Sequence, residues 1–181
     1  MTGVDASELR TGLLIPVHAA DELVHPYRRR HNAVSVARRL PPHITVLFPF
    51  ARAVTVDEQL HLELADLYRA VKAFEAELVD VGSFDEFVWL APEPRDRFVD
   101  LIRLTTAHFP AYPPYESPLV EPWPHLTIAA VDPGTSAESL LESARRELGP
   151  RLPFRFTVDH VALFEERADE TWRAVARFDL R

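Results

Sequence analysis

One short motif occurs twice in the chain, as Pro42-His43-Ile44-Thr45-Val46 and as Pro124-His125-Leu126-Thr127-Ile128. In each copy a proline precedes the histidine, and apolar residues alternate with the histidine and the threonine. Residues i and i+2 of a β-strand project from the same face. The motif therefore predicts two strands that each present a histidine and a threonine on one face and bury apolar side chains behind the other.

Paired histidines and threonines on one face favour acid–base chemistry at a phosphate. An imidazole has an ordinary pKa of about 6.5, so one ring can be neutral while the other is protonated. The neutral ring takes a proton from water, and the protonated ring gives one to the leaving oxygen. Threonine hydroxyls can bind phosphate oxygens. We therefore interpret His43, His125, Thr45 and Thr127 as catalytic residues; a duplicated strand whose histidines only pack is the other interpretation.

The motif does not resemble a metal site. Two histidines alone leave ligands missing, and the chain has neither a His-Glu-x-x-His motif nor an acidic cluster placed to complete them. The absence of cysteine excludes a thiol nucleophile and thiolate metal sites. We expect no metal and no other cofactor.

The composition narrows the class of protein. The 181 residues are 47% hydrophobic and 27% charged, which is typical of a soluble globular chain, and we expect one domain over 1–181. The net charge of −8 disfavours a protein that coats long nucleic acids. No apolar run approaches the roughly 20 residues of a membrane span, and the N-terminus does not resemble a signal peptide. We expect a cytoplasmic protein without membrane partners.

Apolar spacing and turn residues predict an irregular alternation of strands and helices, which indicates an α+β fold. The expected strands are 13–18, 43–50, 76–81, 86–90, 125–131, 154–164 and 172–180. Four helices are expected. The first covers 21–39 with its start near Pro26, and the second covers 57–74 with Asp57 as its cap. The third covers 96–108, and the fourth begins at a Thr135–Glu138 capping box and runs to Leu148.

Two further groups of residues are candidates for substrate binding. Tyr115 and Trp123 lie in a proline-rich loop, 110–124, directly before the second motif. Either residue could stack on a nucleobase, or both could pin the loop to the body of the protein. Three consecutive arginines, Arg28–Arg30, could form a basic rim for RNA phosphates, although a solvated helix face is the favoured interpretation.

At its two motifs the sequence resembles the 2H phosphoesterase superfamily, in particular its 2′-5′ RNA ligase-like branch of cyclic phosphodiesterases. The resemblance extends over nearly the whole chain, from the strand at Leu13–Val17 to the closing Phe178-Asp179-Leu180. It implies a bilobal fold with two pseudo-symmetric, antiparallel-rich sheets around a central cleft and outer helices. It also implies that His43 and His125 act as acid and base.

The resemblance implies an enzyme that opens 2′,3′-cyclic phosphates or cleaves 2′-5′ phosphodiesters, at RNA ends or in small nucleotides. Lys72 is the one lysine, and no Gly-rich phosphate loop is present, so ligation would have to be the reverse of hydrolysis. The alternative is a non-catalytic module that binds a nucleotide or phosphorylated metabolite in the same cleft. The sequence indicates no oligomeric state.

Overall fold

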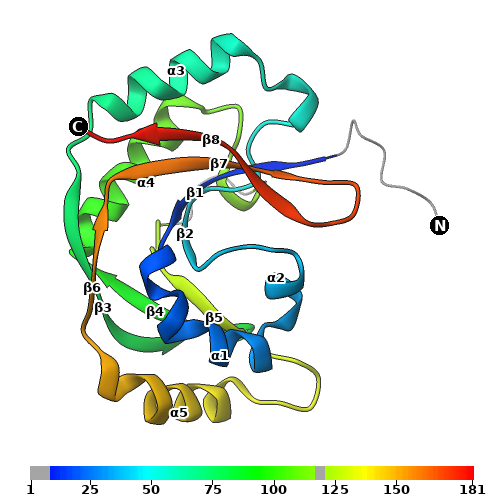
Figure 1. The fold of residues 1–181 in the computed structure, drawn as a ribbon, viewed down its shortest axis with the longest axis vertical. Helices are drawn as coiled ribbons and strands as arrows, with labels where there is room; N and C mark the ends of the chain where they lie inside the picture. The colour runs from blue at the N-terminus through cyan, green and yellow to red at the C-terminus, as the bar shows by residue number, and fades with distance from the viewer. Residues whose placement is uncertain (1–8, 117–120) are drawn as a thin grey trace.

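The computed structural model describes residues 9–116 and 121–181, in which eight antiparallel strands form one curled sheet (Figure 1). The strand order is β6-β3-β4-β5-β2-β1-β7-β8. The strands are β1 (Thr11–Pro16), β2 (His43–Leu47), β3 (Phe74–Ser83), β4 (Phe87–Glu93), β5 (Leu126–Ala130), β6 (Phe154–Val158), β7 (His160–Glu166) and β8 (Trp172–Asp179). The helices are α1 (Asp21–His31), α2 (Ala33–Ala37), α3 (Glu58–Arg69), α4 (Arg95–His108) and α5 (Ala137–Leu148), with short 3-10 turns at His18–Ala20, Ala53–Thr55, Pro114–Glu116 and Gly149–Arg151.

The sheet has two pseudo-symmetric halves of four strands. One half is β2-β1-β7-β8 and the other is β5-β4-β3-β6, so that the two motif strands, β2 and β5, meet in the middle. The helices are exchanged between the halves: α1 follows β1 but packs on β5, and α4 follows β4 but packs on β2. The expected α+β architecture is confirmed, and the two expected sheets are joined into one through the pairing of β2 with β5.

The alternation within each motif strand places its apolar residues in the core. Ile44, Val46, Leu126 and Ile128 are all buried, and they belong to the same cluster as the apolar faces of α1, α3, α4 and α5. Burial of such a side chain contributes about 1.5–3 kcal/mol, so the register of both strands is strongly specified. The histidines and threonines consequently lie on the opposite face of the sheet.

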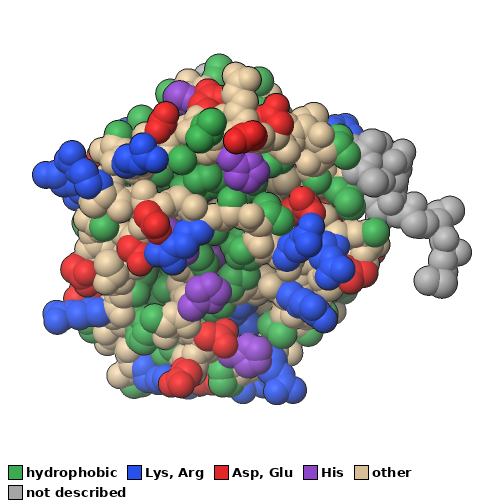
Figure 2. Space-filling view, turned by 45° about the horizontal axis from the view of Figure 1, so that its top comes forward, with side chains coloured by type: hydrophobic (Ala, Val, Ile, Leu, Met, Phe, Trp, Pro, Cys, Tyr) green, Lys and Arg blue, Asp and Glu red, His purple; other side chains and the backbone are tan. Residues whose placement is uncertain are grey.

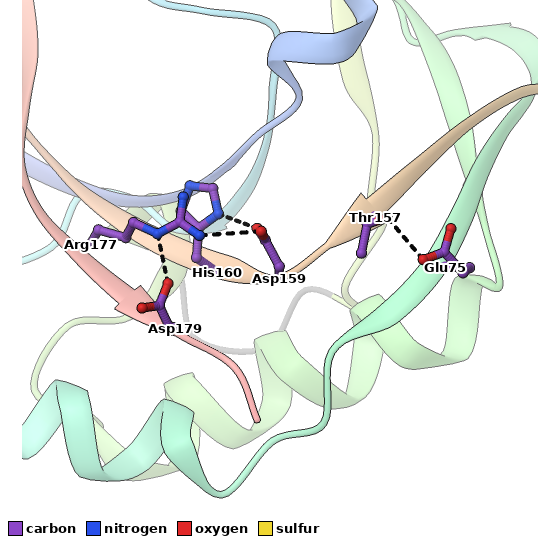
Figure 3. A network of polar contacts seen from close by, with 6 residues as sticks. All are labelled: Glu75, Thr157, Asp159, His160, Arg177 and Asp179. Carbon is purple, nitrogen blue, oxygen red and sulfur yellow. Dashed lines mark hydrogen bonds and ion pairs between the residues drawn. The ribbon is translucent and has the colours of Figure 1, made fainter.

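The segment 154–164, which we expected as one strand, is two strands in opposite halves of the sheet. β6 pairs with β3, and β7 pairs with β1, so the chain crosses from one half to the other at Asp159. Figure 3 shows the polar contacts around this crossing: Asp159 accepts hydrogen bonds from the His160 ring and, at 3.2 Å, from Arg177. Two further contacts in the same view join Arg177 to Asp179 at 2.6 Å and Thr157 to Glu75 at 2.8 Å.

The helix boundaries correct three of the expectations. The expected helix 57–74 ends at Arg69, and Phe74 already begins β3. The first helix begins at Asp21, five residues before Pro26, and the expected helix 21–39 is divided at Asn32 into α1 and α2. The last helix is capped by Ser136, whose hydroxyl accepts the backbone N–H of Ser139 at 3.1 Å, and the expected cap at Thr135 is therefore wrong.

The expected cap at Asp57 is confirmed, because its carboxylate accepts the backbone N–H of Leu60 at 2.9 Å. None of the helices in the described part of the chain could serve as a membrane span.

Candidate active site

The four motif side chains meet where the two halves of the sheet join. Ile44 of β2 pairs with Leu126 of β5 in an antiparallel register. This register sets His43 across from Thr127 and Thr45 across from His125, with the two histidines on a diagonal. Diagonal positions on one sheet face lie about 7–8 Å apart, which leaves room for a phosphate group between the rings.

Each histidine ring is held by the backbone carbonyl two residues before it. His43 Nδ1 lies 2.8 Å from the Pro41 carbonyl oxygen, and His125 Nδ1 lies 2.6 Å from that of Trp123. A carbonyl can only accept, so Nδ1 carries the proton in both rings. The Nε2 atoms are consequently the ones that can exchange protons with a substrate.

The surroundings of the two histidines differ in charge. Burial lowers the pKa of His43 to about 4, against the hydrogen bond to Pro41, and the charges of Arg28 and His125 lower it further. Burial also lowers the pKa of His125, against the hydrogen bond to Trp123. His43 is therefore neutral over the physiological pH range. Positive charges contribute to the lowered pKa of His43, whereas burial alone lowers that of His125.

A cavity of about 270 Å³ opens beside Thr45 and His125. Its aromatic wall includes Trp123, which remains 50% exposed although its ring packs 6.1 Å from Trp89 and lies 4.8 Å from the Arg95 guanidinium. Trp123 is thus fixed against the body of the protein and still presents half of its surface. A mostly apolar, partly open pocket of this kind is typical of a site for a planar ligand group.

Tyr115 lies on the same cavity and is 58% exposed. Its phenol forms a hydrogen bond with the hydroxyl of Thr45, and its backbone N–H donates to the Phe48 carbonyl at 2.7 Å. The loop residue is therefore both anchored to β2 and exposed beside the motif, so the two interpretations of Tyr115 are compatible.

Two aromatic residues that the sequence did not single out surround His125. Phe84 meets the His125 ring edge-on at 5.3 Å between centroids, and Trp89 lies 6.3 Å from it. Phe84 directly follows β3 and Trp89 lies on β4, both far from His125 in the sequence. The signal that could have indicated them is Gly82, the partner of Trp89 in the sheet, because a glycine opposite a tryptophan leaves space for the ring.

The three consecutive arginines occupy different environments. Arg29 is exposed, and Arg30 forms an exposed ion pair with Glu147, as expected of a solvated helix face. That interpretation is wrong for Arg28, which is 2% exposed. The positive charge of Arg28 is one of the causes that lower the pKa of His43.

One face of the molecule is mixed in charge. Figure 2 shows histidine and hydrophobic side chains in the middle of one face, with arginines and carboxylates interspersed around them. Within residues 9–116 and 121–181, no three histidine or carboxylate side chains gather closely enough to hold a metal ion.

Solved structures with the same fold share low sequence identity with this chain. Escherichia coli LigT complexed with 3′-AMP superposes with a TM-score of 0.60 at 17% identity, covering 95% of this chain and 98% of that one. TT0787 of Thermus thermophilus superposes with a TM-score of 0.57 at 18% identity, covering 95% of this chain and 98% of that one. Usb1 of Kluyveromyces marxianus superposes with a TM-score of 0.55 at 12% identity, covering 94% of this chain and 99% of that one.

A search of curated proteins gave no match. The family model described as 2′-5′ RNA ligase superfamily matches residues 15–170, which include both motifs and all but the outermost parts of the chain. Together with the LigT-like fold, this match shows that the chain belongs to the 2′-5′ RNA ligase superfamily of 2H phosphoesterases.

Proposed function

We propose that this protein is a metal-independent phosphodiesterase that opens 2′,3′-cyclic phosphates of small nucleotides or RNA ends. The observation that carries the proposal is the diagonal pair of imidazoles, each with its Nδ1 proton held by a carbonyl and its Nε2 free for chemistry. Membership of a phosphoesterase superfamily supports the reaction class.

In the proposed mechanism His43 is the general base. Burial and the nearby Arg28 charge keep its ring neutral, so Nε2 can take a proton from a water molecule. The water oxygen forms a bond to phosphorus as the bond from phosphorus to one ribose oxygen breaks. His125 donates its Nε2 proton to that oxygen from its protonated form, which the negative charge of the bound phosphate favours against the burial that lowers its pKa. The product is a nucleoside 2′- or 3′-monophosphate. Proton exchange with solvent then restores both rings.

The threonines are proposed to bind the non-bridging oxygens of the same phosphate. Thr45 and Thr127 lie on the same sheet face as the histidines, one beside each ring. A hydroxyl that is already positioned can donate to developing negative charge without reorganising. The hydrogen bond between Thr45 and Tyr115 would fix the direction of one hydroxyl and couple it to the aromatic cavity.

The aromatic cavity is proposed to hold the nucleobase. Trp123 and Tyr115 present exposed ring surface beside His125 and Thr45, and stacking of a base on an aromatic ring contributes about 1–3 kcal/mol. A nucleotide substrate is also in keeping with the ligands of the structural neighbour, since LigT has been crystallised with 3′-AMP and with ATP.

The decisive experiment is incubation of the purified protein with the four nucleoside 2′,3′-cyclic monophosphates in excess EDTA. We expect conversion to a monophosphate of one regiochemistry. His43→Ala and His125→Ala should each lower kcat by about 10²-fold or more, because each removes one partner of a paired proton transfer.

The matched control is His31→Ala, which removes a histidine from the end of α1, outside both motifs. This variant should keep wild-type turnover. Full activity of either motif variant would contradict the paired mechanism, and tight binding of the cyclic nucleotides without product would favour a binding module.

A further inference from the structure

We infer that a second cavity, next to His43, binds a further phosphate group of the substrate through Arg28. The inference rests on the proposed function, since it concerns a subsite of the same cleft. It assigns the preferred substrates to nucleoside 2′,3′-cyclic phosphates that carry another phosphate on the 5′ side.

Arg28 is a buried cation, and the opposite charge that acts on it, Asp21, forms no ion pair with it in the described part of the chain. Arg28 is 2% exposed. Its Nη2 donates to the Leu40 carbonyl at 2.9 Å, while its buried Nε has no hydrogen-bond partner. A buried charge is normally paired, so an unpaired guanidinium is a preformed site for an anion.

Arg28 forms part of the wall of a cavity of about 550 Å³. The charged and titratable side chains on this wall are mostly basic: Arg28, Arg39, Arg173, His18, His25 and Asp21. Asp21, the one carboxylate, lies 3.7 Å from His25. Arg28 is the buried member of the set, whereas Arg39 and Arg173 are exposed at the rim.

This cavity adjoins the catalytic cleft on the side of His43. Pro41 and Pro42 line it, and the Pro41 carbonyl is the group that holds the His43 ring. The aromatic cavity lies on the other side, beside His125 and Thr45. A ligand whose scissile phosphate lies between the histidines can therefore place its base against Trp123 and an anionic group against Arg28.

Among anions, a phosphate or phosphodiester suits this guanidinium best. Arginine presents a planar fork of donors that matches phosphate oxygens, and the unsatisfied Nε of Arg28 has no carboxylate bound to it. A nucleotide already bound by its cyclic phosphate would offer such a group at its 5′ position. This chemistry is shared by a 5′-phosphorylated mononucleotide and by the last nucleotide of an RNA chain.

The test compares three substrates in the wild-type protein: adenosine 2′,3′-cyclic phosphate, the same compound with a 5′-phosphate, and the dinucleotide ApA with a terminal cyclic phosphate. We expect kcat/KM to rise by about tenfold for at least one of the two substrates with a second phosphate. A preference for the 5′-phosphorylated mononucleotide indicates a mononucleotide substrate, and a preference for the ApA dinucleotide indicates an RNA end. Equal values for all three would overturn the inference.

Arg28→Gln should reduce that preference to about one, and Arg29→Gln should leave it unchanged. Arg29 is the matched control, because the substitution removes the same charge from the neighbouring exposed position of α1. If Arg28 acted only through the His43 ring, the substitution would change kcat/KM equally for all three substrates, and the preference for a second phosphate would remain. A preference that persists in Arg28→Gln would exclude Arg28 as the phosphate ligand.

A binding measurement separates this inference from the proposed reaction. Calorimetric titration with adenosine 2′-monophosphate and adenosine 2′,5′-bisphosphate requires no turnover. We expect tighter binding of the bisphosphate in the wild-type protein and a loss of that difference in Arg28→Gln, while circular dichroism confirms folding. A difference in affinity without turnover would support the subsite and contradict the proposed reaction. Turnover with equal affinities would support the reaction and contradict the subsite.

Discussion

Gly82 lies beneath the Trp89 ring, at the back of the aromatic cluster around His125. A Cβ atom at this position would come within 2.2 Å of the ring, which no side-chain rotation of alanine can relieve. Gly82→Ala should therefore destabilise the protein by roughly 1–3 kcal/mol and displace Trp89 from His125. Urea titration followed by tryptophan fluorescence would measure both effects.

Gly149 provides the comparison for this substitution. It ends α5 with helical angles, φ −49° and ψ −46°, and an added Cβ would meet no atom within 4 Å. Gly149→Ala should be neutral or stabilising by about 0.4–1 kcal/mol, because alanine restricts the unfolded chain. Equal losses for both variants would mean that the contact with Trp89 is not the cause.

The N-terminus of α5 distinguishes two adjacent hydroxyl residues. Ser136 caps the helix by accepting the Ser139 N–H, whereas Thr135 lies one residue earlier in the preceding turn. Ser136→Ala should lower the unfolding free energy by about 0.5–2 kcal/mol, and Thr135→Ala should leave it nearly unchanged. Thermal denaturation of the two variants in parallel would decide which residue is the cap, and a larger loss for Thr135→Ala would contradict the assignment.

The sequence predicts most elements of this protein, because helical and strand periodicities are local. It does not predict the division of 154–164 into β6 and β7, since apolar residues continue on both sides of Asp159 and nothing local records that the two strands belong to opposite halves of the sheet. It likewise does not separate Arg28 from Arg29, because which arginine is buried depends on how α1 packs across the sheet. The four motif residues could be proposed as a site from the sequence because the motif occurs twice.

At the scale of the whole molecule, two electrostatically unfavourable groups lie next to the first motif. Arg28 is buried without an ion pair to Asp21, and the adjacent His43 is held neutral. Other arginines are paired, as in the double contact of Arg10 with Glu166 at 2.9 Å. Such a distribution is expected where a preformed site awaits an anion, because the ligand supplies the missing charge.

The lowered pKa of His43 predicts how stability depends on pH. The folded ring titrates at about 4 and the unfolded ring at about 6.5, so the unfolded state binds more protons between these values. Stability is therefore complete above pH 6.5 and decreases as the pH falls toward 4. Between pH 7 and pH 5 the loss from His43 alone is roughly 2 kcal/mol.

Urea titrations at pH 7 and pH 5 would test this dependence in the wild type and in His43→Gln. Glutamine can still donate to the Pro41 carbonyl but does not titrate, so the variant should lose clearly less stability over the same interval. His125, whose pKa is also lowered, should supply the part that remains. The lowered pKa values of Asp159 and Glu166 act in the same direction but at more acidic pH, so they do not obscure the comparison. An identical loss in both proteins would show that the His43 ring is protonated as readily in the folded cleft as in the unfolded chain.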